Sequence, residues 1–276
     1  MSLSYWLFRV RSTWRWYWST KTKYDVHSPF MADFLDKVIF DQRDFHVFGL
    51  AQQIKLWWRQ QSGTIQTLEL GAPSKVSTSA QRSIRSLVQQ SAVSDQCGKW
   101  LFKTALWAKA KHLVELGTNA GISSLYLHFA DKQANLHTIE GNPETAQLAQ
   151  RTFQIAKTSP ALHLYNNTFA AILPPVLELV PQLDLLFIDG DHRQEATLLN
   201  VQTCLEKAQE NSVFIIADIH WSPDMESAWK ELQQLPEVTA SLDTYHFGFL
   251  FFRKGITPGQ HLSIIGAKWK PWRMGF

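Results

Sequence analysis

The stretch from residue 112 to residue 125, HLVELGTNAGISSL, constrains the fold of this chain more than any other. An apolar run ends beside an acidic residue, a short loop with two glycines follows, and apolar residues then recur at helical spacing. Glycine lets the backbone pass close to a ligand, so the pattern predicts a strand, a ligand-binding loop and a helix. Strand and helix patterns alternate from there to about residue 253, which predicts a parallel sheet covered by helices on both faces.

The predicted fold class is therefore α/β, with a Rossmann-like seven-stranded sheet and an N-terminal helical region. Strands are expected at 112–116, 135–140, 161–166, 184–189, 212–217, 237–243 and 246–253. Helices are expected at 122–130, 143–157, 170–180, 194–209 and 225–233. The last two strands flank a short turn at Tyr245 and should form an antiparallel hairpin at the sheet edge. We expect an N-terminal helical and cover region (1–95), an α/β domain (96–256) and a tail (257–276).

Glycine spacing separates the kinds of nucleotide that such a loop could bind. Dinucleotide-binding loops read G-x-G-x-x-G, whereas Gly117 and Gly121 are separated by three residues, and no Lys-Ser/Thr pair of a phosphate-binding loop follows. Glu140 closes the second apolar run. A carboxylate at that position holds the ribose hydroxyls of an adenosine in doubly wound folds. The ligand is thus expected to be an adenosine compound without a pyrophosphate.

Together these features resemble class I S-adenosylmethionine (SAM) methyltransferases. The resemblance rests on HSPF at 27–30, ELGTNAG at 115–121, DGDH at 189–192 and DIHWS at 218–222, and it points to a bacterial branch related to small-molecule O-methyltransferases. It implies SAM as the cofactor and an SN2 transfer to an oxygen or nitrogen of a small molecule. The residues that it implies for SAM are Glu115, Gly117, Thr118, Asn119, Gly121 and Ser123 for methionine, Glu140 and Gly141 for ribose, Thr168 and Phe169 for adenine, and Asp189 beside the methyl group.

Acidic residues and histidines follow the fourth and fifth predicted strands. Ligands of open α/β sheets lie beyond the carboxyl ends of the strands, so Asp189 and His192 should meet Asp218 and His220 there. Asp218 and His220 share a face if the chain stays extended. With Asp189 they would form an O,O,N site for Mg²⁺ or another divalent metal. The alternative is a metal-free site in which His192 or His220 removes the acceptor proton and Asp189 orients the donor.

At two positions the sequence differs from the related enzymes, so both the metal site and the metal-free site remain possible. Metal-dependent O-methyltransferases follow the fifth-strand Asp with Asn, and here the residue is Ile219. Macrolide-type relatives often carry paired acids, and here the first of the pair is Ala217. Asp191 is equally well explained as a cap of the next helix.

Residues 1–24 interleave aromatic and basic side chains. We expect a helix whose aromatic face packs on the domain or on a second subunit in a homodimer, with peripheral membrane contact as the alternative. Residues 68–75 resemble an imperfect second copy of the glycine loop, and the polar, basic residues 77–90 suggest a cover over the site.

Composition limits the partners. The net charge of +3 is too small to argue for nucleic acid, and no (D/N)-P-P-(Y/F/W) motif of DNA amino-methyltransferases follows the fourth strand. DNA is therefore not expected, and RNA methylation remains an alternative, as does a non-catalytic SAM-binding scaffold. Cys97 and Cys204 lack metal-ligand spacing, and no apolar run approaches a transmembrane length. These features favour a cytoplasmic location.

Overall fold

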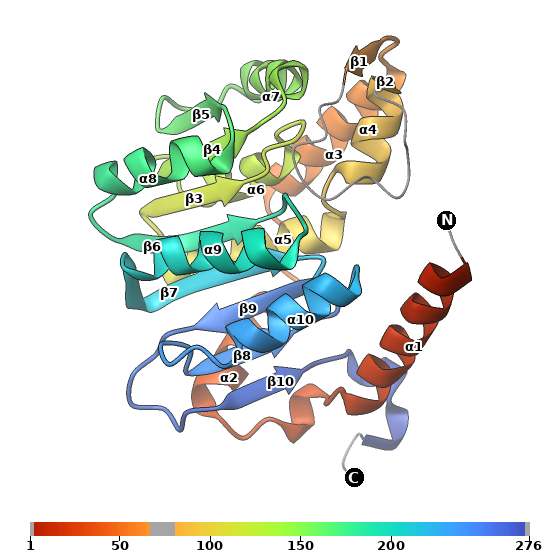
Figure 1. Cartoon of the computed structure of the whole chain (residues 1–276), viewed down its shortest axis with the longest axis vertical. Helices are drawn as coiled ribbons and strands as arrows, with labels where there is room; N and C mark the ends of the chain where they lie inside the picture. Colours follow the sequence, from red (N-terminus) through yellow and green to blue (C-terminus); the bar gives the residue numbers. More distant parts are fainter. Residues whose placement is uncertain (1–2, 67–80, 274–276) are drawn as a thin grey trace.

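An eight-stranded sheet forms the centre of the computed structural model, which describes residues 3–66 and 81–273 (Figure 1). The strand order is β10-β8-β9-β7-β6-β3-β4-β5. The strands are β3 (His112–Leu116), β4 (Asn135–Glu140), β5 (Leu162–Asn166), β6 (Leu183–Ile188), β7 (Ala208–Ala217), β8 (Ala240–Asp243), β9 (Phe247–Phe251) and β10 (Gln260–Ser263). All seven predicted strands are present, and the mostly parallel α/β sheet is confirmed.

The C-terminal hairpin differs from the prediction in one respect. β8 and β9 pair antiparallel as expected, and β9 also pairs antiparallel with β7. The hairpin does not form the sheet edge, because β10 pairs parallel with β8 outside it. The segment after residue 256 therefore contributes a strand to the sheet. The sequence QHLS of this strand has no run of apolar residues that would have predicted it.

Helices cover both faces of the sheet. They are α5 (Asp95–Ala108), α6 (Ile122–Ala130), α7 (Pro143–Ala156), α8 (Phe169–Leu179), α9 (Gln194–Leu205) and α10 (Pro223–Leu232). Figure 1 shows α8, α9 and α10 on the near face. Side chains alternate along each strand, so Val114 and Leu186 join the apolar cluster under these three helices, and Leu113 and Leu185 join the cluster on the opposite face. Because helices cover both faces of the sheet, a site for a ligand must lie at the ends of the strands.

Residues before the sheet form a mostly helical region, as predicted. Its elements are α1 (Leu3–Ser19), α2 (Pro29–Phe34), a π-helical turn (Leu35–Ile39), α3 (His46–Gln60), β1 (Thr64–Gln66), β2 (Gln81–Ser83) and α4 (Ile84–Ser91). Ser28 caps α2 by accepting a hydrogen bond from the backbone N–H of Met31, and Pro29 is its first residue. The imperfect glycine loop predicted at 68–75 lies outside the described residues, as does part of the cover at 77–90.

The first helix packs against the C-terminal segment of its own chain, beyond the edge strand β10 (Figure 1). The hydroxyl of Tyr17 donates to the carbonyl oxygen of Trp269 at 2.8 Å, and Lys21 forms a parallel β-bridge with Ile264. Among the described residues, no helix has the length and apolar character needed to cross a membrane.

Candidate functional site at the carboxyl edge of the sheet

The loop after β3 presses against the end of β6. Gly117 has φ +101°, and a Cβ atom at this position would lie 2.3 Å from the carbonyl oxygen of Asp189. Gly121 has φ +80°, and a Cβ atom there would lie 2.7 Å from the ring of Phe153. Both positions therefore require glycine, for conformation and for space. The loop predicted to bind the cofactor thus lies directly beside the end of the β6 strand.

Glu140 fastens this loop at the end of β4. Its carboxylate accepts hydrogen bonds from the backbone N–H groups of Asn119 at 2.8 Å and Asn142 at 2.9 Å. Burial raises the pKa of Glu140, although the N–H groups of Asn142, Asn119 and Gly141 favour the charged form. Glu140, which is predicted to bind the ribose, is therefore in contact with the loop that is predicted to bind the methionine part of the cofactor.

Glu115 lies under the loop and is completely buried. Its Oε2 atom accepts hydrogen bonds from the hydroxyls of Ser124 and of Thr138, the latter at 2.7 Å. Its Oε1 atom has no hydrogen-bond partner among the described residues. Burial raises the pKa of Glu115 to about 7, against the opposing effect of the neighbouring serine and threonine hydroxyls.

The partners of Glu115 were not predicted from the sequence. Thr138 lies directly opposite Glu115 in the pairing of β3 with β4, so the strand register could have identified it. Thr118 is also fully buried, and its hydroxyl lies 2.5 Å from that of Thr138. Thr118 therefore fastens the base of the loop.

The residues predicted to border adenine follow β5. Thr168 is exposed at the N-cap of α8, and Phe169 is the first residue of that helix and is half-buried. A Cβ atom on Gly190 would lie 2.8 Å from the ring of Phe169. The Gly190 position therefore brings the end of β6 against the start of α8, at the same edge of the sheet as Glu140.

Three of the predicted polar residues converge at the tips of β6 and β7. Asp189, His192 and Asp218 can each place one ligand atom within 4.8 Å of the other two. His192 Nε2 lies 3.8 Å from Asp189 Oδ1 and 4.0 Å from Asp218 Oδ2. Burial, with the charges of Asp218 and Glu115, raises the pKa of Asp189 well above its usual range. Two carboxylates and an imidazole form a suitable ligand set for a divalent cation.

His220 does not belong to this cluster, contrary to the prediction. Its Nδ1 lies 3.0 Å from Glu226 Oε1 and its Nε2 lies 2.9 Å from Asp243 Oδ2, so both ring nitrogens are occupied. Burial alone would lower its pKa, but the hydrogen bonds to Asp243 and Glu226 raise the pKa to about 9. A histidine that is charged and paired at neutral pH neither binds a metal nor accepts a proton.

The reason for this error is the backbone at Asp218. β7 ends at Ala217, and Asp218 has φ +54°, in the left-handed region. The chain therefore turns at Asp218, and the rule that residues two apart share a face no longer applies. Asp218 stays at the strand tip, whereas His220 points toward α10 and β8. His192, predicted only as a base, takes the third place in the cluster.

Asp191 serves the local backbone and Arg193. Its φ is +48°, and its carboxylate accepts hydrogen bonds from Arg193 at 2.5 and 2.7 Å. This salt bridge lies beside the first turn of α9. Arg193 occupies the N-cap position of α9 and no side chain caps it, so the suggested capping role of Asp191 is wrong and its carboxylate holds Arg193 instead.

Comparison with known protein families explains this arrangement. A family model described as a methyltransferase domain matches residues 114–219, the interval that includes Glu115, the glycine loop, Glu140 and the cluster. This part of the chain is therefore similar to methyltransferase domains.

Relatives of the methyltransferase domain act on different acceptors. Catechol O-methyltransferase of Mycobacterium tuberculosis is 28% identical over 134 residues, which cover 46% of this chain and 57% of that protein. Ribosomal RNA small subunit methyltransferase G of Campylobacter jejuni is 31% identical over 117 residues, which cover 40% of this chain and 53% of that protein. The chain thus spans about half the length of these relatives.

Solved structures show that the fold is shared over a longer part of the chain. The O-methyltransferase TomG of Streptomyces achromogenes, solved in complex with SAM, aligns with a TM-score of 0.54 at 16% identity. The alignment covers 80% of this chain and 94% of that structure. The helical region before the methyltransferase domain therefore belongs partly to the shared fold.

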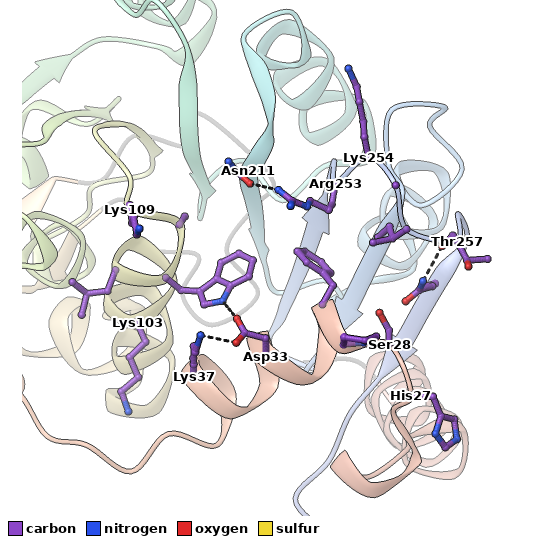
Figure 2. Close-up of a pocket in the computed structure, with 18 of the residues that line it drawn as sticks. His27, Ser28, Asp33, Lys37, Lys103, Lys109, Asn211, Arg253, Lys254 and Thr257 are labelled. Atoms are coloured by element: carbon purple, nitrogen blue, oxygen red, sulfur yellow. Dashed lines mark hydrogen bonds and ion pairs between the residues drawn. The ribbon is translucent and has the colours of Figure 1, made fainter.

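A cavity of about 1310 Å³ lies at the opposite edge of the sheet from the site (Figure 2). It is lined by Lys109 before β3, Asn211 in the first half of β7 and Arg253 after β9. Figure 2 shows Arg253 directed toward Asn211, and Lys103 and Lys254 directed away from each other. The glycine loop, Glu140 and the Asp189 cluster do not line it, so this cavity is separate from the candidate site.

Proposed function

We propose that this chain is a SAM-dependent methyltransferase that transfers a methyl group to an oxygen of a small molecule. The observation that carries the proposal is the contact between the glycine loop and the tip of β6, where the Cα region of Gly117 meets the backbone of Asp189. A donor bound on the loop would have its reactive end beside Asp189, His192 and Asp218. Placing donor and acceptor in line is the main contribution that a protein makes to such a transfer.

The residues around the loop fit SAM. The unpartnered, buried Oε1 of Glu115 is an acceptor for the ammonium group of a methionine moiety, because a buried carboxylate oxygen without a donor is costly. Glu140 would accept hydrogen bonds from the ribose hydroxyls. Thr168 and Phe169 would border the adenine. SAM supplies a sulfonium that makes its own methyl group electrophilic.

The cluster fits a divalent cation with Asp189, His192 and Asp218 as its ligands. The raised pKa of Asp189 reflects burial and the neighbouring charge of Asp218, which a cation at this position would offset. A bound cation would lower the pKa of an acceptor hydroxyl. In the alternative arrangement, His192 takes the hydroxyl proton at its Nε2 atom. His220 takes no part in either arrangement, and it serves the packing of α1 and α10 instead.

An oxygen of a small molecule is favoured over the other acceptors. A cluster of two carboxylates with one histidine suits a compact hydroxyl acceptor, and the catechol relative is named for one. The alternatives of RNA methylation and of a SAM-binding scaffold without catalysis are not favoured. Buried, unpaired Cys97 and Cys204 agree with a reducing compartment, so we propose a cytoplasmic location.

The test is a methyl-transfer assay with labelled SAM and a panel of catechols and simple phenols. We expect transfer to an oxygen that is abolished by Asp218→Asn and retained by Asp243→Asn, whose carboxylate lies outside the cluster. If a chelator abolishes the activity and magnesium restores it, a bound cation activates the acceptor hydroxyl. If the activity resists the chelator and is lost in His192→Ala, His192 is the base that takes the proton. Transfer that persists in Asp189→Asn, Asp218→Asn and His192→Ala alike would refute the proposed site.

A further inference from the structure

One face of α1 is fixed to the protein by polar contacts. The hydroxyl of Ser12 donates to Glu226, Trp16 Nε1 donates to Asp243 at 2.8 Å, and an Arg9 N–H donates to the carbonyl oxygen of His220 at 2.9 Å. Tyr5 and Trp221 also pack edge to face, with ring centroids 5.8 Å apart. The helix is therefore held in one orientation, and its opposite face is fixed with it.

That opposite face is apolar and open to solvent. Trp6, Val10, Trp14 and Trp18 follow one another at intervals of four residues, so they lie along one side of the helix. Their exposed fractions are 57%, 64%, 65% and 55%, and Leu7 beside them is 62% exposed. The expected packing of this helix on its own domain thus accounts for one of its faces and leaves this one uncovered. A contiguous exposed apolar face of this kind marks an interaction site.

The C-terminal turns extend the same surface. Trp269 and Trp272 are 61% and 62% exposed, and they lie in the 3-10 turns Ala267–Trp269 and Pro271–Arg273. These turns are joined to α1 by the hydrogen bond from Tyr17 to Trp269, and Figure 1 shows them beside the C-terminal end of that helix. Exposed tryptophans therefore lie along α1 and on the turns that contact its C-terminal end.

The charge of the two chain ends has a single sign. Neither residues 1–24 nor residues 257–276 contain an aspartate or a glutamate, whereas the whole chain has 24 acidic residues. Their basic residues are Arg9, Arg11, Arg15, Lys21, Lys23, Lys268, Lys270 and Arg273. Arg11, Lys21 and Lys23 are exposed. Lys270 is buried and Arg15 pairs with Glu226, so Arg11, Lys21, Lys23 and Lys268 are the basic residues that accompany the exposed tryptophans at the surface.

We propose that the exposed face of α1 and the adjoining C-terminal turns form a peripheral binding surface for anionic phospholipid bilayers. Tryptophan favours the boundary between headgroups and acyl chains, and arginine and lysine are attracted to anionic headgroups. A second copy of this chain is a poorer occupant, because two such faces would bring like charges together. The surface is distinct from the methyl-transfer site and places the helix that covers the loop after Asp218 at the membrane.

Flotation of the whole chain with vesicles tests this proposal. We expect binding to phosphatidylglycerol-containing vesicles and not to pure phosphatidylcholine, with loss of binding in Trp6→Ser/Trp14→Ser. The matched control is Leu179→Ser/Leu199→Ser, which removes two equally exposed apolar side chains elsewhere and should bind as the wild type does. Equal loss in both double variants, or no flotation of the wild type, would overturn the proposal.

A charge reversal separates the electrostatic part of the binding. Arg11→Glu/Lys21→Glu should reduce partitioning by roughly fivefold or more for each basic residue removed. Lys132→Glu, at the end of α6, should leave partitioning unchanged. SAM titration of the same variants should be unaltered, which keeps this test independent of the proposed activity. If sedimentation shows instead that the tryptophan variants convert a dimer to a monomer, the face is a subunit interface and the lipid proposal is wrong.

Discussion

At the scale of single residues, Glu140 is the side chain that most directly connects the fold to cofactor binding. Its carboxylate already accepts two backbone N–H groups at the base of the glycine loop. Glu140→Ala should weaken the binding of SAM by roughly 1.5–3 kcal/mol, because a charged hydrogen-bond acceptor is lost. Calorimetric titration of the variant with SAM measures this change.

The matched control for Glu140 is Asp184. The carboxylate of Asp184 also accepts two backbone N–H groups, from Lys111 and His112, but at the amino ends of the strands. Asp184→Ala should lower the melting temperature and leave the affinity for SAM unchanged. Equal affinities for SAM in Glu140→Ala and the wild type would mean that the ribose site lies elsewhere.

Residue-level prediction from the sequence succeeded where a residue type was tied to a strand end. Glu140 and Asp189 were placed at strand tips because each terminates an apolar run. Prediction failed at His220, because aspartate adopts the left-handed conformation only occasionally, so the turn at Asp218 could not be expected from its residue type. The backbone conformation of Asp218 thus turns His220 away from the cluster, in which His192 is the histidine.

At the scale of elements, the pairing of β4 with β5 should make the chain sensitive to acid. Burial lowers the pKa of His137 on β4 to about 4, with a further contribution from the charge of His163. The unfolded chain titrates near pH 6.5 and binds more protons between these values. The stabilising contribution is therefore complete above about pH 6.5 and is lost as the pH falls toward about 4.

His137→Phe tests this element. The variant should lose less stability than the wild type between about pH 7 and about pH 4, by on the order of 2 kcal/mol. Urea unfolding at each pH provides the measurement, and the exposed His27→Phe should follow the wild-type curve. Parallel pH curves for His137→Phe and the wild type would show that His137 does not titrate on unfolding.

The attachment of α1 depends on Glu226 of α10. Glu226 accepts from Ser12, pairs with Arg15 at 3.2 Å and contacts His220. Glu226→Ala should raise the population of detached α1 by roughly tenfold, since a partly buried acceptor is lost. Trypsin cleavage within α1 reports this opening.

Asp224→Ala is the matched control for that experiment. Asp224 is an exposed acid in the same first turn of α10 and makes none of these contacts with α1. It should leave the cleavage rate unchanged. Faster cleavage in both variants would indicate fraying of α10 and not release of α1.

Element boundaries inside the sheet were predictable because apolar runs define them. β3, β4 and α6 begin and end at the predicted residues. β10 was not predictable, because it is a polar edge strand whose position depends on pairing with β8. The polar anchoring of α1 was equally hidden, since Ser12 and Glu226 are 214 positions apart in the sequence.

At the scale of the whole molecule, the two apolar clusters explain why the site lies at one edge. Side chains of β3, β6 and β7 fill both clusters, so only the strand ends remain available for chemistry. The glycine loop, Glu140 and the Asp189 cluster all occupy the carboxyl ends of the strands, whereas α1 contacts the loop after β7 with one face and turns its tryptophans to solvent. A cofactor site and a surface for lipid can therefore coexist in one chain.

The central claim is that this carboxyl edge binds SAM. Calorimetric titration of the whole chain with SAM, and separately with NAD, tests it most directly. We predict saturable binding of SAM at a single site and no binding of NAD, because the loop between Gly117 and Gly121 lacks the spacing for a pyrophosphate. Binding of NAD without binding of SAM would contradict it.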